Sequence, residues 1–162
     1  MLKGAFFMQK MSTRWLVKTA LIAALYVAVT LALAPISYGE VQFRLSEVLV
    51  LLAFFQPAAI PGLVIGCFLA NLGSPLGPID PVLGTLATLL SVLAIRKTRQ
   101  LLGDSTKSLF VAGLWPVVFN GLIVGAMLTY LFGIPFYLTV ASVAFGEAVV
   151  VLAAGVPLFH FL

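Results

Sequence analysis

Charged side chains are scarce in this sequence of 162 residues. Asp, Glu, Lys and Arg make up 9% of it, whereas 62% of the residues are hydrophobic and the mean hydropathy is +1.19. A soluble domain of this size needs far more polar surface. The sequence therefore predicts an all-α integral membrane protein, and the length favours one membrane domain over residues 1–162.

Reactive and metal-binding residues are equally few. The sequence has one cysteine, Cys67, and one histidine, His160. One cysteine forms no internal disulfide, and one Cys with one His provides no metal-ligand spacing. The sequence contains no phosphate-binding loop of the G-x-x-x-x-G-K-[ST] type and no convincing nucleophile–base pair. We therefore expect no cofactor, no bound metal and no enzymatic activity.

Acidic and basic residues are segregated along the chain. Eight of the nine basic residues form two clusters: Lys3, Lys10, Arg14 and Lys18, then Arg96, Lys97, Arg99 and Lys107. Cytoplasmic loops of membrane proteins collect Lys and Arg, so both clusters are predicted to be cytoplasmic and separated by an even number of spans. This placement beside apolar runs favours a topology signal over a nucleic-acid-binding surface. Four of the five acids lie outside the clusters: Glu40, Glu47, Asp80 and Glu147.

Apolar runs predict spans over residues 15–34, 109–132 and 135–161, and a shorter one over 82–95 that starts near Ile79. Residues 47–72 form either one kinked span or two short helices that turn within 56–62. Pro57 and Pro61 favour the turn, because proline disfavours helix at its own position and at the residue before it. Two short helices also give the even number of spans. We therefore predict six transmembrane helices with both termini cytoplasmic.

This topology sorts the loops. Residues 35–46, 73–81 and 133–135 are predicted to lie outside, and residues 56–62 and 97–107 inside. The first two outer loops carry most of the polar side chains, so the chemistry is expected at the outer face.

Small residues recur at helical spacing. Ala20, Ala24 and Ala28 follow one another at four-residue intervals on the first predicted helix. Such a face allows close approach of another helix, either of a partner protein or of the same chain. The pairs Gly62/Gly66 and Gly121/Gly125 are interpreted as packing within the monomer.

Four motifs carry a resemblance to a known family: SYGEVQFRLSE at 37–47, PGL at 61–63, ANL at 70–72 and GPIDPVLGT at 77–85. From about residue 19 to 147 the chain resembles the QueT family, small membrane proteins described as substrate-binding S-components of energy-coupling factor (ECF) importers for queuosine precursors. The resemblance implies six helices in the prokaryotic plasma membrane. It also implies a transmembrane coupling subunit that docks on Ala20, Ala24 and Ala28, and two ATPase subunits that hydrolyse ATP.

The implied ligand is a 7-deazaguanine such as preQ1 or preQ0. Its guanine-like edge presents a ring N–H and an exocyclic amine, and one carboxylate accepts hydrogen bonds from both. The aminomethyl cation of preQ1 would favour a second carboxylate. We expect Glu147 to accept from the donor edge, because an ionisable residue within a span indicates function. Asn71, Asn120 and Asp80 are its expected polar companions.

Three of these residues also have a structural interpretation. Glu147 could pair with Arg44, Asn120 could bond between helices, and Asp80 could cap the fourth helix ahead of Pro81.

The first outer loop carries the remaining candidates for ligand binding: Tyr38, Glu40, Arg44 and Glu47. Arg44 could instead bridge the two glutamates and order the loop, and Tyr38 could belong to an interfacial aromatic belt. Two other functions stay open at this point. One is an S-component for another vitamin or nucleobase, and the other is a membrane enzyme or a structural assembly subunit.

Overall fold

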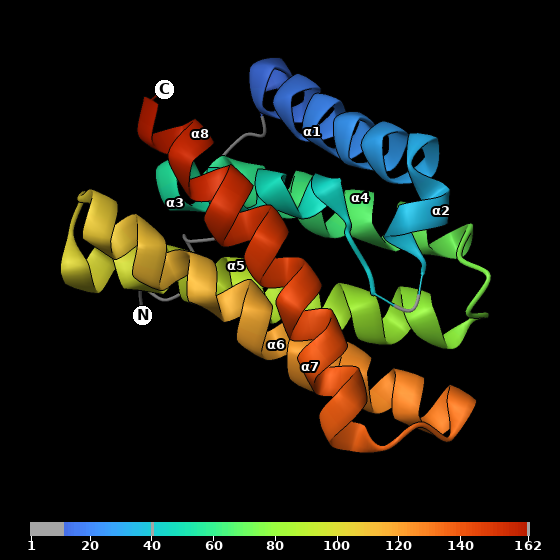
Figure 1. Ribbon diagram of the computed structural model, residues 1–162. Coiled ribbons are helices and arrows are strands. Elements are labelled where there is room, and N and C mark those ends of the chain that lie inside the picture. Colours follow the sequence, from blue (N-terminus) through green and yellow to red (C-terminus); the bar gives the residue numbers. More distant parts are fainter. Residues whose placement is uncertain (1–11, 40, 162) are drawn as a thin grey trace, which may run out of the picture.

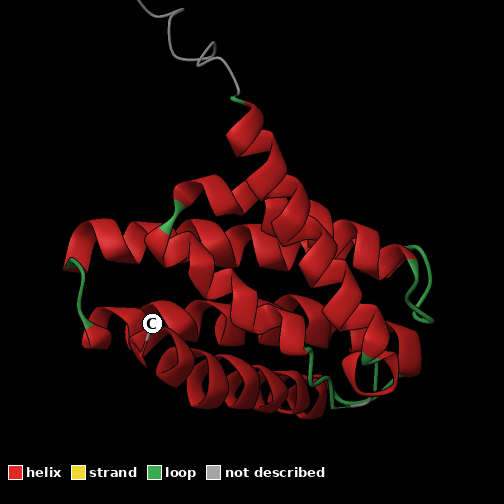
Figure 2. Cartoon of the chain, turned by 90° about the horizontal axis from the view of Figure 1, so that it is seen from above, coloured by secondary structure: helices red, strands yellow, loops and turns green. Residues whose placement is uncertain are grey.

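The computed structural model describes residues 12–39 and 41–161, and this part of the chain consists of helices and short loops without a strand (Figure 2). The elements are α1 (Thr13–Ala32), α2 (Ala34–Ser37), the 3₁₀ helix η1 (Leu45–Leu51), α3 (Leu52–Phe55), the 3₁₀ turn η2 (Pro57–Ala59), α4 (Ile60–Leu72), α5 (Ile79–Leu102), α6 (Thr106–Phe132), α7 (Phe136–Glu147), the π-helix η3 (Ala148–Gly155) and α8 (Val156–Phe161).

Four described stretches are long and apolar enough to cross a membrane: Thr13–Ala32, Ile79–Leu102, Thr106–Phe132 and Phe136–Phe161. These are the four spans expected from the apolar runs, and they make the chain a multi-pass membrane protein. Two shorter apolar helical stretches, Leu45–Phe55 and Pro57–Leu72, occupy the region predicted to hold two short helices. A count of six membrane-spanning helices, and the side on which each terminus lies, remain predictions.

The break between the short helices falls at Gln56, whose backbone is extended (φ −131°, ψ 106°) immediately before Pro57. The ring of Pro57 disfavours the helical conformation at Gln56, which explains the position of the break. The backbone carbonyl of Phe54 accepts hydrogen bonds from Nη1 of Arg99 at 2.9 Å and of Arg96 at 3.5 Å. These side chains satisfy an acceptor that the end of the helix would otherwise leave free.

The inner loop predicted over 97–107 is shorter than expected. Helix α5 continues to Leu102, Gly103 turns the chain with φ +78°, and Ser105 caps α6. Arg99 explains the extension, because it pairs with Asp104 at 2.8 Å while it donates to Phe54. The basic residues Arg96 and Arg99 therefore lie on the last turns of a helix rather than in a loop.

The loops gather at two ends of the bundle (Figure 1). The end formed by α2, the 38–44 segment and the α4–α5 and α6–α7 connections is here called the loop end. The opposite end holds α8 and the α5–α6 turn and is called the basic end. Tyr38, Leu76 and Ile134 come from three connections and line one cavity, so these connections meet in space.

Helices α1 and α4 pack very closely. A Cβ atom added to Gly62 would lie 2.7 Å from the Thr19 carbonyl oxygen, and one added to Gly66 would lie 2.9 Å from Cβ of Tyr26. The interpretation of Gly62 and Gly66 as packing within the monomer is thus confirmed. A Cβ on Gly125 would likewise lie 3.0 Å from Val140, which supports the same interpretation for the second pair.

Two segments with unusual helical geometry lie against each other. A Cβ on Gly155, in the π-helix η3, would lie 2.9 Å from the Leu51 side chain at the end of the 3₁₀ helix η1. Glu47 lies in η1, and Glu147 is the last residue before η3. Short π-helical segments inside α-helices are frequent at functional sites. The segment that carries Glu47 therefore packs on the segment that directly follows Glu147.

Candidate functional site

A group of polar side chains lies inside the bundle, each of them at most 6% exposed. This buried polar cluster comprises Tyr26, Arg44, Glu47, Asn71, Asp80, Thr88, Asn120 and Glu147. Its members come from α1, the 38–44 segment, η1, α4, α5, α6 and α7. Burial of so many polar groups is costly unless they are satisfied by one another or by a ligand.

Glu47 is held on one side only. Its Oε1 atom accepts a hydrogen bond from the Tyr26 hydroxyl and another from Thr88 Oγ1 at 3.4 Å. Its Oε2 atom is buried without a hydrogen-bond partner. The Thr88 hydroxyl is in turn 3.2 Å from Sγ of Cys67. The carboxylate is therefore fixed by α1 and α5, while its second oxygen is left as a free acceptor.

Asn71 and Asp80 lie across the α4–α5 connection. The Asn71 amide nitrogen donates to the Asp80 backbone carbonyl at 3.5 Å and to Sγ of Cys67 at 3.4 Å. This orientation leaves Asn71 Oδ1 unpartnered, and both carboxylate oxygens of Asp80 are also buried without a partner. Gly84 permits the approach, since a Cβ there would lie 2.5 Å from Asn71 Nδ2 and 3.1 Å from Asp80 Oδ1.

The interpretation of Asp80 as a helix cap is wrong. The N-cap residue of α5 is Pro78, which has no side-chain hydrogen bond, and Asp80 already lies inside the first turn. The Asp80 carboxylate accepts no backbone N–H bond. Capping therefore does not explain why this carboxylate is buried.

Asn120 of α6 and Glu147 of α7 also belong to the buried polar cluster. The Asn120 side chain interacts with the carboxyl groups of both Glu47 and Glu147. The Asn120 Nδ2 atom nevertheless lacks a partner within hydrogen-bond distance and angle, and Glu147 Oε2 also lacks one. Within the described residues Arg44 forms no ion pair, so the alternative interpretation of Glu147 as a structural partner of Arg44 is not supported at 4.0 Å.

Arg44 contacts its own segment instead. Its Nη2 atom donates to Gln42 Oε1 at 3.4 Å, and its guanidinium carbon lies 5.6 Å from the centre of the Tyr38 ring. The Tyr38 hydroxyl donates to the Ala70 carbonyl at 2.6 Å, which ties the segment to α4. A bridge from Arg44 to Glu47 is also absent at 4.0 Å, and Glu40 lies outside the described residues.

Burial and neighbouring ionisable groups both shift the pKa values of Tyr38 and Arg44. Burial raises the pKa of the Tyr38 phenol, with Arg44 opposing the shift and Asp80 adding to it. For Arg44 burial lowers the pKa, but the fields of Tyr26, Cys67, Asp80 and Glu47 outweigh burial and raise it overall. Arg44 therefore stays positively charged at all ordinary pH values.

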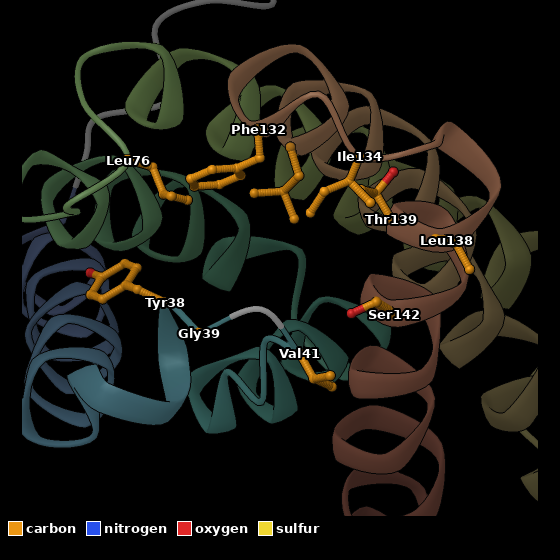
Figure 3. Close-up of a pocket in the computed structure, with 10 residues that line it drawn as sticks. Tyr38, Gly39, Val41, Leu76, Phe132, Ile134, Leu138, Thr139 and Ser142 are labelled. Atoms are coloured by element: carbon orange, nitrogen blue, oxygen red, sulfur yellow. The ribbon is translucent and has the colours of Figure 1, made fainter.

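A cavity of about 360 Å³ lies at the loop end (Figure 3). Tyr38, Gly39 and Val41 line one side of it, and the other lining residues come from the α4–α5 connection and from α6 and α7: Leu76, Leu128, Phe132, Ile134, Leu138, Thr139 and Ser142. The next residue of the segment, Gln42, packs on α7, where a Cβ on Gly146 would lie 2.2 Å from the Gln42 carbonyl oxygen. The 38–44 segment thus borders the cavity with Tyr38 and Val41 and enters the buried polar cluster with Arg44.

Most of the residues predicted from sequence come together here. Arg44, Glu47, Asn71, Asp80, Asn120 and Glu147 are all in the buried polar cluster, and Tyr38 lies at its border with the cavity. Tyr26, Thr88 and Cys67 were not predicted as site residues. The signal for Tyr26 is its spacing on α1, since the four buried residues of that helix, Thr19, Ala23, Tyr26 and Thr30, define one face.

Comparisons with known proteins give one family. A family model described as QueT transporter matches residues 16–162. A curated relative, the queuosine precursor transporter QueT of Lactococcus lactis subsp. cremoris (strain MG1363), is 46% identical over 66 residues. This match covers 40% of the chain and 39% of the relative's length. No solved structure matches the chain. Since the family model covers nearly the whole chain, the protein belongs to the QueT transporter family.

Proposed function

We propose that this chain is the substrate-binding S-component of an ECF importer and that it captures a 7-deazaguanine queuosine precursor at the outer face of the plasma membrane. The observation that carries the proposal is the set of unpartnered acceptors in the buried polar cluster. Five oxygen atoms on Glu47, Asn71, Asp80 and Glu147 lack hydrogen-bond partners. A ligand rich in N–H donors would satisfy them and repay the cost of their burial.

The guanine-like edge of a 7-deazaguanine matches Glu147 best. Glu147 has an unpartnered oxygen, and Asn120 beside it can supply an amide N–H or carbonyl to the neighbouring ring position. The cavity at the loop end is lined by Tyr38, whose ring packs against Arg44 of the buried polar cluster, and we propose that the planar ring enters from this side. The name of the Lactococcus relative agrees with this class of ligand.

The groove on α1 supports the importer part of the proposal. Ala20, Ala24 and Ala28 are exposed and line an apolar groove with Ile65 and Leu69 of α4. Small side chains on a membrane helix allow a partner helix to approach closely, which is the geometry that a transmembrane coupling subunit requires. Two ATPase subunits would complete the importer. The chain itself contains no phosphate-binding loop.

Binding to the purified protein tests the proposal. The detergent-solubilised chain is titrated by calorimetry with preQ1, preQ0, guanine and adenine, and bound small molecules are identified by mass spectrometry. We expect tight binding of at least one deazaguanine and poor binding of adenine, because adenine presents a different donor pattern. Binding of another vitamin or nucleobase with no binding of a deazaguanine would defeat the substrate assignment.

A further inference from the structure

The buried polar cluster contains more acid than base. Glu47, Asp80 and Glu147 are each at most 6% exposed, and Arg44 is the one basic residue among them. No ion pair within 4.0 Å joins Arg44 to an acid of the described chain. If all four groups are ionised, three negative charges face one positive charge. An uncompensated buried charge is strongly destabilising, so such an excess is relieved either by protonation of a carboxyl group or by a positively charged partner.

The unpartnered atoms show where such a partner would lie. Glu47 already uses one oxygen for Tyr26 and Thr88, and Glu147 lies beside the amide of Asn120. Asp80 differs, because both of its carboxylate oxygens lack hydrogen-bond partners although the residue is 0% exposed.

Asn71 adds a third acceptor at the same place. Its Nδ2 atom is turned toward the Asp80 backbone and Cys67, which leaves Asn71 Oδ1 without a partner. Gly84 lies against both side chains, since a Cβ there would be 2.5 Å from Asn71 Nδ2 and 3.1 Å from Asp80 Oδ1. The α4–α5 junction therefore presents three acceptor oxygens, one carboxylate among them, and a compact ammonium group offers three donors that fit such a set.

We infer that Asp80, with Asn71 Oδ1 beside it, forms a subsite for a positively charged amino group of the ligand, so that the protein selects cationic over neutral 7-deazaguanines. This inference rests on the proposed function and assigns the two ends of the ligand to different acids. Glu147 receives the guanine-like edge, and Asp80 receives the charged substituent. The aminomethyl compound preQ1 carries such a charge, whereas the nitrile preQ0 is neutral.

The test compares ligands that differ only in the substituent. Calorimetric titration of the purified wild-type chain with preQ1, preQ0 and 7-methyl-7-deazaguanine should show at least tenfold tighter binding of preQ1 than of either neutral compound. The Asp80→Asn variant should lose most of this preference, because it should bind preQ1 more weakly and keep the affinity for preQ0. Asp104→Asn is the matched control, because it removes an acid at the basic end and should leave the preference unchanged.

Glu147→Gln provides a second variant if Asp80→Asn fails to fold. This variant should bind both preQ1 and preQ0 more weakly by a similar factor and should keep the preference for preQ1. Equal binding of preQ1 and preQ0 by the wild-type chain would overturn the inference while leaving the proposed function in place. An equal loss for both ligands in Asp80→Asn would also overturn it, by showing that Asp80 acts on the fold. Absence of binding by every deazaguanine would defeat the proposed function itself.

Discussion

At the scale of single residues, the three acids of the buried polar cluster differ in how many of their oxygens are hydrogen-bonded. Glu47 is anchored by Tyr26 and Thr88, so its position is set before any ligand arrives. Glu47 and Glu147 each keep one unpartnered oxygen, and Asp80 keeps two. A membrane interior offers no water to satisfy such atoms, which makes them the strongest indication of a ligand in this chain.

Replacement of Glu147 by Gln should weaken binding of a 7-deazaguanine ten- to a hundredfold, about 1.4–2.8 kcal/mol. The amide keeps the shape of the side chain but turns one acceptor into a donor that faces a donor of the ligand. Calorimetric titration of wild-type and variant protein measures the change. An unchanged affinity would remove Glu147 from the site.

Replacement of Gly146 by Ala should weaken binding as well, by displacing the 38–44 segment rather than by removing a ligand contact. The added Cβ would lie 2.2 Å from the Gln42 carbonyl oxygen, so the segment that carries Arg44 must shift. Gly73→Ala is the matched control, because its Cβ would meet nothing closer than 3.4 Å. The ligand affinities of the two variants, measured by titration, should differ by tenfold or more. Equal affinities would contradict a role for this contact.

At the scale of elements, the first helix has one face packed on α4 and another that is exposed in a groove. Its buried face, with Thr19, Ala23 and Tyr26, packs on α4 through Gly62 and Gly66. The alanines that were predicted as a docking face line the exposed groove instead of this contact. The close contacts of Gly62 and Gly66 with α1 are made by other residues of that helix than Ala20, Ala24 and Ala28.

Replacement of Ala24 by Trp should abolish assembly with a coupling subunit and substrate uptake, while the isolated chain still binds its ligand. The bulky ring fills the groove and prevents close approach of a partner helix, yet it lies away from the buried polar cluster. Leu25→Trp is the matched control, since Leu25 is also exposed on α1 but does not line the groove. Co-purification and uptake assays report the result. Normal assembly of the Ala24→Trp variant would show that the groove is not the docking surface for a coupling subunit.

The sequence predicts elements better than it predicts their local geometry. Four long helices and the break at Pro57 follow from apolar runs and from the steric effect of proline. The extension of α5 past Arg96 was missed, because charged residues suggest a loop unless their partners are known. Those partners, the Phe54 carbonyl and Asp104, are supplied by tertiary structure.

The candidate site shows the same limit. Isolated acids beside or within apolar runs suggest Asp80 and Glu147 as candidates from sequence alone. The π-helix after Glu147 and the contact of Gly146 with Gln42 arise from packing between distant segments, so no local sequence pattern predicts them. For Tyr26, the spacing of Thr19, Ala23, Tyr26 and Thr30 marks one face of α1, but its hydrogen bond to Glu47 arises from tertiary structure.

At the scale of the whole molecule, polarity is distributed between the two ends. The loop end holds the cavity and the entry of Arg44 into the buried polar cluster. The basic end holds Arg96 and Arg99, which bind the end of α3, and the turn to α6. If the positive-inside rule applies, the cavity faces outside and the basic end faces the cytoplasm.

Cysteine accessibility in intact cells tests this orientation. Cys67 is the one cysteine of the sequence and is buried, so Cys67→Ser gives a background without thiols. In that background a cysteine replaces either Pro75, which is exposed in the α4–α5 connection, or Asp104, which is exposed at the α5–α6 turn. An impermeant thiol reagent should label position 75 in intact cells and position 104 only after the membrane is opened, because lipid bars the reagent from the cytoplasm. Labelling of position 104 in intact cells would reverse the topology, place the cavity on the cytoplasmic side and remove the basis for capture of a ligand from outside.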